Sequence, residues 1–396
     1  MADAIRHPVA IRILICYVTA GAGHRRAAEA IAQAAAHAFP QAELECRDLL
    51  EDVPAWLRRA YPRTYYFLVR RVPLIWAACF ALLDHVPVYP LAQPLRRWWN
   101  LLMARRFIER LKRTPPDVIV TTHFFPTDVV GACKQAGWLH APLVVVVTDL
   151  HPHRFWLSAQ ADAYVMGVEA GAAIARQRGI PQERLHVLGI PIGGASHASV
   201  DRHTLRRQLG LHPDRFTVLI TSGGNTVGPF ARVVGALLDL EPVVPGRLQL
   251  IVVCGDNAAA VRRLQARAGA ATMPARVFGF IDNMPEVMAA SDLAVTKAGG
   301  VTVSEALGRG LPLVLFHVIP GQEQLNAQYV AAHGAGLIAL SPAAVARTVR
   351  WLVEDPSRLE AMRRAGCSLS RPDAAAAIVS QVIAPLVQGS RPPPSC

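Results

Sequence analysis

The chain has 396 residues, 52% of them hydrophobic, and a formal net charge of +12. This length predicts two domains of ordinary size, and the longest uncharged apolar run, residues 72–83, is too short for a transmembrane helix of about 20 residues. The seven cysteines are scattered without a CxxC pair. That pattern argues against a disulfide framework or structural zinc site and favours a reduced, cytoplasmic setting.

The first half of the chain alternates short apolar runs with helical patterns. Its N-terminus indicates a buried strand rather than a signal peptide, and leads through TAGAGH into an alanine-rich helix at residues 25–38. Further strands are expected over residues 117–122, 141–149, 162–168 and 184–190. Near-continuous runs of Val, Ile and Leu are typical of a parallel sheet covered by helices on both faces.

Residues 56–113 interrupt this rhythm with amphipathic helical patterns. The segment contains twelve Lys or Arg against two acidic residues, and four of the seven tryptophans. A basic, Trp-rich segment with apolar interludes suits either nucleic acid or an anionic lipid surface. We therefore predict a helical insertion at about residues 55–113.

The strand and helix pattern restarts after a loose stretch at residues 192–200. The later strands are expected over residues 215–224, 248–256, 275–281, 291–296 and 311–316. The sequence therefore predicts an α/β fold with two doubly wound, Rossmann-like domains. Their expected bounds are 1–195 and 196–388, followed by a tail at residues 389–396.

Three glycine-containing turns follow predicted strands: TAGAGH at residues 19–24, TSGGNTVG at 221–228 and TKAGGVT at 296–302. Such a turn before a helix N-terminus presents free N–H groups and a positive dipole end to an anion. Packing alone explains any one turn, but three of them favour a diphosphate in the cleft between the domains. None matches an ATP phosphate loop, and GAGHRR matches a dinucleotide fingerprint poorly.

A carboxylate and a cluster of amide side chains follow the third turn. Glu305 lies on the helix after this turn, where a carboxylate can accept hydrogen bonds from a ribose diol. The turn amides expected to contact phosphate belong to Gly299, Gly300 and Thr302. The next helix begins with three residues suited to sugar hydroxyls, Gln322, Glu323 and Gln324. A capped surface helix explains that second cluster about equally well.

These motifs resemble the diacylglycerol glycosyltransferases, that is, the bacterial processive glucosyl- and galactosyl-diacylglycerol synthases and the plant monogalactosyldiacylglycerol synthases. The likeness covers nearly the whole chain and is strongest over residues 275–330, which include VFGFIDNMPEVMAASDLAVT and PGQEQLN. TAGAGHRRAAEAIAQA is similar to the family's acceptor-side turn. The resemblance implies a GT-B fold, a UDP-sugar substrate, inversion at the anomeric carbon, and no metal or other cofactor. The sequence also contains no D-x-D motif.

The same resemblance implies roles for individual donor-side residues. Glu305 would hold the ribose and Glu323 the sugar hydroxyls. Further donor-side positions are Gly223 and Gly224 beside the diphosphate, Phe280 and Ile281 around the uracil, and Lys297. Departures from the family pattern leave glucose or galactose undecided; they are Gly300 with Val301, Asp256 with Asn257, and Asn225.

His24 matches the family's acceptor-side histidine and is expected to be the general base or its orienting group. An imidazole is suited to taking a proton from a glycerol or sugar hydroxyl near pH 7. Asp149, at the end of a strand facing the same cleft, is the competing base. His123 and His151 are ranked below Asp149 as candidate bases.

A lipid acceptor would require the cleft to reach a membrane. We expect residues 56–113 to dock on an anionic lipid surface, with indole rings at headgroup level and cations facing the lipid. The expected membrane-binding residues are Arg70, Arg71, Trp76, Arg96, Arg97, Trp98 and Trp99. The alternative is an ordinary helical insertion whose apolar face is core. The expected location is peripheral, on the cytoplasmic face of the inner membrane.

The resulting hypothesis is transfer of glucose or galactose to diacylglycerol, or onward to the glycosyl-diacylglycerol. An N-acetylglucosaminyltransferase with a polyprenyl-linked acceptor is an alternative with the same fold, but its donor helix resembles IPGQEQLN less. A nucleic-acid-binding protein is disfavoured, because the arginines alternate with apolar blocks rather than with stacking aromatics. His24, Glu305 and Glu323 argue against an inactive relative.

Overall fold

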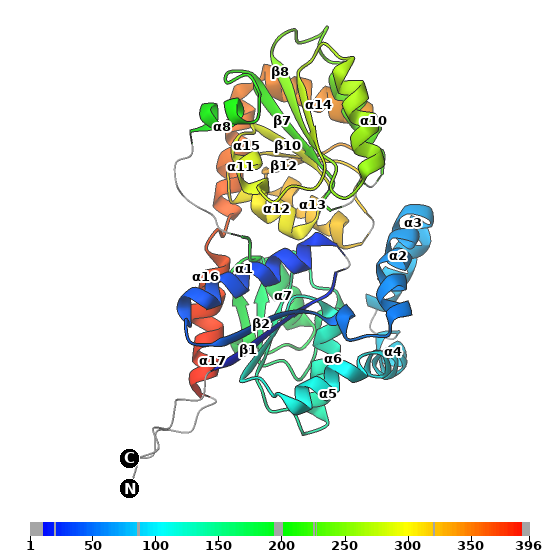
Figure 1. The fold of residues 1–396 in the computed structure, drawn as a ribbon, viewed down its shortest axis with the longest axis vertical. Helices are drawn as coiled ribbons and strands as arrows, with labels where there is room; N and C mark the ends of the chain where they lie inside the picture. Colours follow the sequence, from blue (N-terminus) through cyan, green and yellow to red (C-terminus); the bar gives the residue numbers. More distant parts are fainter. Residues whose placement is uncertain are drawn as a thin grey trace.

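Two parallel sheets of six strands frame the protein, one in each half of the chain (Figure 1). The computed structural model describes residues 11–19, 21–84, 88–193, 201–224, 226, 228–319 and 321–389. The strand order is β2-β1-β3-β4-β5-β6 in the N-terminal sheet and β12-β11-β10-β7-β8-β9 in the C-terminal sheet. The expected α/β class with two doubly wound domains is confirmed.

The N-terminal sheet consists of short strands whose central members are buried on both faces. Its strands are β1 (Arg12–Tyr17), β2 (Glu43–Asp48), β3 (Val118–Thr121), β4 (Leu143–Val146), β5 (Ala163–Met166) and β6 (Leu185–Val187). Its connecting helices are α1 (Ala22–Ala38), α6 (Phe124–Gln135) and α7 (Glu169–Gln177), with shorter 3-10 turns at η1 (Leu49–Glu51), η2 (Arg154–Trp156) and η3 (Gln182–Arg184). Continuous Val and Ile runs therefore became interior strands, as this pattern predicts.

The C-terminal sheet repeats this architecture. Its strands are β7 (Phe216–Thr221), β8 (Leu248–Val253), β9 (Ala275–Phe278), β10 (Leu293–Thr296), β11 (Leu313–Leu315) and β12 (Gly336–Ile338). Its helices are α8 (Arg202–Gln208), α9 (Phe230–Leu238), α10 (Ala258–Gly269), α11 (Met284–Ala289), α12 (Gly300–Leu307), α13 (Gln322–Ala332), α14 (Pro342–Glu354) and α15 (Pro356–Leu369). All strand pairs in both sheets are parallel.

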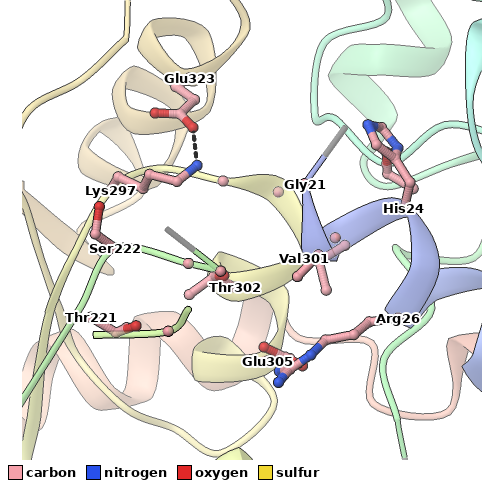
Figure 2. A pocket seen from close by; sticks show the side chains of 18 of the residues that line it. Gly21, His24, Arg26, Thr221, Ser222, Lys297, Val301, Thr302, Glu305 and Glu323 are labelled. Atoms are coloured by element: carbon pink, nitrogen blue, oxygen red, sulfur yellow. Dashed lines mark hydrogen bonds and ion pairs between the residues drawn. The ribbon is translucent and has the colours of Figure 1, made fainter. Parts of the chain in front are cut away.

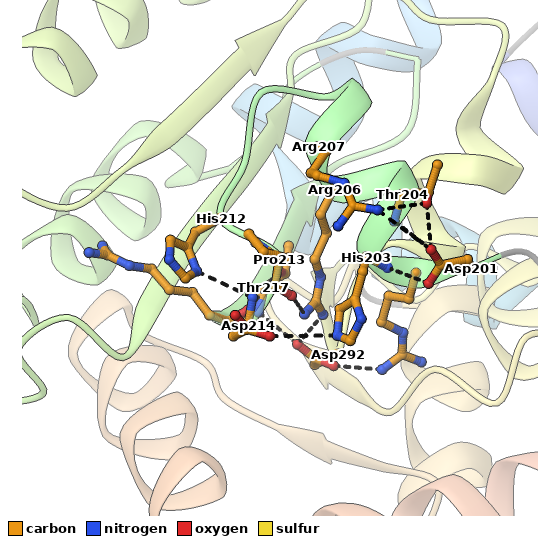
Figure 3. A network of polar contacts seen from close by, with 12 residues as sticks. Asp201, His203, Thr204, Arg206, Arg207, His212, Pro213, Asp214, Thr217 and Asp292 are labelled. Carbon is orange, nitrogen blue, oxygen red and sulfur yellow. Dashed lines mark hydrogen bonds and ion pairs between the residues drawn. The ribbon is translucent and has the colours of Figure 1, made fainter.

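A buried ion-pair network fastens α8 to the C-terminal sheet (Figure 3). The buried Arg206 lies 2.6 Å from Asp292, and Arg202 lies 2.7 Å from the other oxygen of the same carboxylate. Asp292 also accepts a hydrogen bond of 2.8 Å from the Thr217 amide. The C-terminal domain therefore includes α8, whereas the boundary expected at 195–196 falls within residues 194–200, outside the described residues.

The segment expected to form a helical insertion contains four helices: α2 (Ala55–Arg71), α3 (Pro73–Asp84), α4 (Tyr89–Met103) and α5 (Arg105–Arg113). Met103, Phe107 and Leu111 anchor α4 and α5 in the core, whereas α3 has no buried residue. By length and composition, no single helix in the described ranges can cross a membrane, although the bent pair of α2 and α3 together passes that test.

The final helices return from the C-terminal half to the N-terminal sheet. They are α16 (Ala374–Ile378), the π-helical segment η4 (Val379–Ile383) and α17 (Ala384–Gly389). Ile378, Val382 and Ile383 join Ile13 and Ile15 of β1 in one apolar cluster. The sequence suggested that the C-terminal domain extends to residue 388. Residues 374–389 instead complete the core of the N-terminal domain.

Candidate active site

A cleft lies where the carboxyl ends of the two sheets face each other. Its lining comes mainly from the turns after β1, β4, β7, β8, β9 and β10, from α2, and from the start of α13. It encloses about 1200 Å³ of space continuous with solvent. In open α/β sheets ligands bind outside the carboxyl ends of the strands, so this cleft is the expected place for a ligand.

The first glycine turn places His24 in the first turn of α1, at the edge of the cleft (Figure 2). Its Nδ1 lies 2.7 Å from the Thr122 carbonyl oxygen and 3.0 Å from the Thr148 hydroxyl. Because a carbonyl oxygen only accepts, Nδ1 carries the hydrogen and donates it to Thr122. The other ring nitrogen, Nε2, therefore keeps its lone pair and is able to accept a proton.

His24 is half-buried and lies beside aromatic rings. The His123 ring meets it edge-on with centroids 4.6 Å apart, and the Trp156 ring lies 6.1 Å away. Burial lowers the pKa of His24 to about 4, against the opposing effect of its hydrogen bond to Thr122. The imidazole is consequently neutral at pH 7, which is the form that a general base requires.

Asp149 lines the same cleft just after β4. Burial raises the pKa of its carboxyl to about 6, and the nearby Glu323 adds to the shift, while hydrogen bonds from Asn326 and Trp156 oppose it. His123 and His151, the other candidate bases, do not line the cleft. His123 instead accepts a hydrogen bond from the Phe125 amide at the start of α6.

The third glycine turn brings α12 against the N-terminal domain. A Cβ atom on Gly300 would lie 2.1 Å from the Thr148 carbonyl oxygen, so this position leaves no room for a side chain. Gly299 and Thr302 line the cleft beside it, as do Gly223 and Gly224 after β7. These turns place backbone amides and the N-terminus of α12 where an anion would be stabilised.

Glu305 forms an ion pair across the two domains. Its Oε1 accepts a hydrogen bond of 3.2 Å from Nη1 of Arg26, and only 6% of the residue is exposed (Figure 2). Burial raises the pKa of the Glu305 carboxyl, whereas Arg26 and Arg309 oppose this shift. Both partners line the cleft. The predicted ribose acceptor is therefore a buried carboxylate that already has one cationic partner.

Lys297 and Glu323 form a second buried ion pair on the donor side (Figure 2). Burial alone would lower the pKa of Lys297, but Glu323 outweighs it and the pKa is raised. The ammonium group therefore stays charged near neutral pH. Oε2 of Glu323 is buried without a hydrogen-bond partner among the described residues. A buried acceptor without a hydrogen bond costs free energy. This oxygen is therefore suited to accept a hydrogen bond from a ligand hydroxyl.

The remaining donor-side predictions divide between the cleft and the surface. Phe280, Ile281 and Gln322 line the cleft. Gln324 does not line it and is exposed, because it follows Glu323 on α13 and so points about 100° around the helix axis. The expectation that Gln324 contacts the sugar is thus not supported by its position.

The predicted membrane-binding residues also differ in their surroundings. Trp98 and Trp99 on α4 are 58% and 41% exposed, and Arg71 is exposed. Arg96 instead forms a 3.1 Å ion pair with Asp128 of α6, and Arg97 donates a hydrogen bond to Gln135. Arg96 therefore fastens α4 to the domain and is not a free, lipid-facing cation.

The two remaining predicted membrane-binding residues are Trp76 and Arg70. The Trp76 ring lies against Tyr65, with ring centroids 5.5 Å apart, and is only partly exposed. The side chain of Arg70 and the family departure at Asn225 lie outside the described part of the chain.

Among the cleft residues that the sequence analysis did not single out are Arg26, Tyr65, Tyr66 and Val69. Arg26 follows His24 by two positions, within the same GAGHRR motif. The other three lie on α2, in the insertion assigned to the membrane. Their signal in the sequence was a pair of tyrosines flanked by arginines, which by itself does not point to a cleft.

Comparison with known proteins assigns the family. Residues 24–192 match the monogalactosyldiacylglycerol (MGDG) synthase family model, and residues 217–378 match the glycosyltransferase family 28 C-terminal domain. Monogalactosyldiacylglycerol synthase from Spinacia oleracea is 31% identical over 378 residues, which cover 93% of this chain and 71% of that protein. The chain belongs to the monogalactosyldiacylglycerol synthase family. This confirms the resemblance stated from the sequence.

Other relatives support the same family and fold. A processive diacylglycerol beta-glucosyltransferase from Bacillus cytotoxicus is 29% identical over 289 residues, or 72% of each chain. The solved structure of MnaA with UDP from S. aureus has a TM-score of 0.63 at 13% identity, covering 97% of this chain and 99% of that one. MurG from Acinetobacter baumannii has a TM-score of 0.58 at 15% identity, covering 96% and 99%. At these identities the structures show the fold alone, and they confirm GT-B.

Proposed function

We propose that this protein transfers glucose or galactose from a UDP-sugar to diacylglycerol at a membrane surface, with inversion, and onward to the resulting glycosyl-diacylglycerol. Family membership supports a glycosyltransferase that acts on diacylglycerol. The observation that supports a UDP-sugar as the donor is the buried Glu305 on the helix after the third glycine turn. It lies within the cleft that also holds the Lys297–Glu323 pair. The Glu305 carboxylate suits the ribose hydroxyls, the Lys297 cation suits the diphosphate, and Oε2 of Glu323 is able to accept a hydrogen bond from the sugar. Together they suit a nucleotide diphosphate sugar.

In the proposed reaction, an acceptor hydroxyl attacks C1 of the donor sugar from the face opposite UDP. Its proton passes to Nε2 of His24, the new C1–O bond forms, and the bond between C1 and the diphosphate oxygen breaks. UDP leaves with the bonding electron pair. Lys297 and the N-terminus of α12 lie in the same cleft and stabilise this developing negative charge.

We propose that this charge stabilisation needs no metal ion, since Lys297 and the N-terminus of α12 line the cleft in which the diphosphate is expected. Transfer should then persist in excess EDTA and should gain nothing from added Mg²⁺ or Mn²⁺. Loss of turnover in EDTA, restored by a divalent cation, would contradict this part of the proposal.

Membrane docking is proposed for the exposed faces of α3 and α4. The outer face of α3 carries Leu74, Ile75 and Leu82, each more than half exposed, and the helix contains no Lys or Arg. A nucleic acid would require cations at such a surface, whereas a lipid interface accepts apolar side chains with indoles at its edge. Stronger retention at low salt on DNA than on phosphatidylglycerol liposomes would reverse this assignment.

The deciding experiment incubates the pure protein with diacylglycerol in phosphatidylglycerol liposomes and one donor at a time. UDP-glucose, UDP-galactose and UDP-N-acetylglucosamine are compared, and a polyprenyl-linked acceptor is included in a parallel set. We expect glycosyl-diacylglycerol from UDP-glucose or UDP-galactose, and none from an inactive His24→Ala, Asp149→Asn double variant. Transfer of N-acetylglucosamine to the polyprenyl acceptor alone would establish the alternative function instead.

A further inference from the structure

His317 has a backbone conformation that residues with side chains rarely adopt. It follows the last residue of β11 by two positions, and its φ is 46°. Among the residues that the structure describes, it is the only non-glycine residue with a positive φ. In this left-handed region Cβ crowds the backbone, so the conformation persists only where the surrounding structure imposes it. Residues strained in this way cluster at ligand-binding sites.

The imidazole ring of His317 packs directly on Gly228, the last residue of the second glycine turn. A Cβ atom on Gly228 would overlap Cγ and Cδ2 of the ring and would lie 2.5 Å from its Nδ1. Gly228 also has a left-handed backbone, with a φ of 64°. The ring therefore occupies the space that a side chain at position 228 would need.

The contact joins the second glycine turn to the end of β11. Phe316 and Phe230, which lie next to this contact in the chain, are both buried, and their ring centroids are 6.4 Å apart. The Phe316 amide donates a hydrogen bond of 3.0 Å to the Thr296 carbonyl oxygen, so the end of β11 is tied to β10. The position of the His317 ring is thus set by the C-terminal sheet.

The second glycine turn itself has features that point to a ligand. Thr221, Ser222, Gly223 and Gly224 line the cleft. The buried hydroxyl of Thr221 has no hydrogen-bond partner in the described ranges, and a buried polar group in that state costs free energy. A Cβ atom on Gly223 would lie 3.3 Å from Cε of Lys297. The turn therefore lies beside the cation that is expected to meet the diphosphate.

The shape of the His317 ring matters more here than its charge. Burial lowers the pKa of His317, and the opposing effect of Glu323 is smaller. The ring is consequently neutral at pH 7. His317 also does not line the cleft, so its influence on a ligand passes through Gly228.

We propose that His317 is a positioning residue for the donor: its ring fixes Gly228, and thereby holds the second glycine turn in the conformation that binds the diphosphate. This inference rests on the proposed function, because the diphosphate belongs to the UDP-sugar. The strained backbone of His317 is maintained by the folded domain. The turn is therefore ordered before the donor arrives, and less conformational freedom is lost on binding.

Removing the ring should weaken donor binding without slowing the chemical step. We expect His317→Gly to lower calorimetric UDP affinity about tenfold, a usual coupling between residues in contact. The KM for UDP-glucose or UDP-galactose, whichever the unaltered protein uses, should rise by about the same factor with kcat unchanged. Because glycine adopts the left-handed conformation freely, the variant should melt close to the parent. A lower kcat at unchanged KM would overturn the proposal.

Two glycine variants isolate the ring contact. Gly228→Ala places a methyl group where the ring lies, so it should also lower UDP affinity about tenfold. Gly246→Ala is the matched control, because its φ of 67° is nearly the same but a Cβ atom there would meet no described atom within 4 Å. It should bind UDP like the parent.

The double variant tests whether the two positions act together. His317→Gly gives the methyl group of Gly228→Ala room, so the double variant should bind UDP no more weakly than His317→Gly alone. Losses that simply add would show that His317 does not act through Gly228, and would overturn the proposal. UDP binding by the unaltered protein and His317→Gly with equal affinity would do the same. If the unaltered protein binds no UDP, the proposed function itself fails, which is a different result.

Discussion

His24 and Asp149 share one cleft but have opposite pKa shifts. Burial lowers the pKa of His24 to about 4 and raises that of Asp149 to about 6. Near pH 7 both groups are therefore in their basic forms. His24 has the better-defined geometry, because its Nδ1 hydrogen is committed to the Thr122 carbonyl oxygen and Nε2 is left to accept a proton. Asp149 is the group that titrates within the usual assay range.

The two groups are separable by substitution and by pH. We expect His24→Ala to lower turnover by about two to four orders of magnitude with UDP affinity nearly intact. Turnover of the unaltered enzyme should fall as the pH is lowered through about 6, because Asp149 gains its proton there while His24 stays neutral. Asp149→Asn should remove this acidic limb of the profile. Near-normal turnover in His24→Ala would transfer the base role to Asp149.

The Arg26–Glu305 pair predicts a pH-dependent donor affinity. Glu305→Ala should weaken UDP binding by roughly 1–3 kcal/mol, as for a hydrogen bond to a charged group. Arg26 holds the pKa of Glu305 down against burial. Arg26→Gln should therefore raise that pKa. As the pH is lowered, UDP affinity measured by calorimetry should then begin to fall at a higher pH than in the parent.

Arg25→Gln provides the matched control for this pair. Arg25 lies on the same helix but pairs with Glu29 at the surface, so its removal should leave UDP affinity unchanged at every pH. If Arg26→Gln follows the parent across the pH range, Arg26 has no influence on the ribose-binding carboxylate.

Within single helices, strands and turns, sequence patterns predicted those features that depend only on neighbouring residues. The glycine turns at residues 221–228 and 296–302 and their strands were found because turn chemistry and apolar runs are properties of a few neighbouring residues. The meeting of Arg26 with Glu305 joins residues 279 positions apart, and no local pattern encodes such a contact. The inward-facing tyrosines of α2 were missed for a related reason. An amphipathic pattern in α2 does not show whether its tyrosines face the cleft or another surface.

Insertion helix α4 predicts a membrane-binding phenotype. Trp98→Ala combined with Trp99→Ala should reduce co-sedimentation with phosphatidylglycerol liposomes, because exposed indoles are favoured at headgroup level. UDP affinity should not change. Binding should also weaken with salt, since each basic residue near an anionic surface contributes about 1 kcal/mol. Arg96→Glu is a poor substitution for this purpose, because it would place a carboxylate beside Asp128.

Trp351→Ala is the control for α4, because Trp351 is also exposed but lies on α14 of the C-terminal domain, against Arg358. It should sediment with liposomes like the parent. If the Trp98, Trp99 variant does the same, the docking surface lies elsewhere on the protein.

At the scale of the whole molecule, the two domains share their interiors. Ala27 and Leu150 from the N-terminal half join Val301 and Val303 from the C-terminal half in one apolar cluster. Gly300 and Thr148 meet at backbone distance, and α16 to α17 pack on the N-terminal sheet. The domain bounds expected from the sequence failed at residues 374–389, because an apolar helix does not reveal which of two sheets it will cover.

The packing of the last helices predicts stability effects far from the cleft. Ile378 is fully buried against the N-terminal sheet, so Ile378→Ala should destabilise the protein by about 2–5 kcal/mol, the usual range for a buried Ile. Thermal unfolding would measure this loss. Gln381→Ala, on the exposed side of η4, should melt like the parent. Equal melting of both variants would show that these helices do not complete the N-terminal core.

The same packing has a consequence for protein synthesis. The N-terminal sheet ends with β6 at Val187, yet Ile378 and Ile383, which cover one face of it, are made almost two hundred residues later. At about 5–20 residues per second, the ribosome exposes an incompletely covered sheet for about ten seconds or more. Domains usually fold in order from the N-terminus, but here the first domain to be translated is the last to be finished. A chaperone that binds apolar strands should therefore engage nascent chains of this protein between these two points, and release them only after α17 has left the exit tunnel.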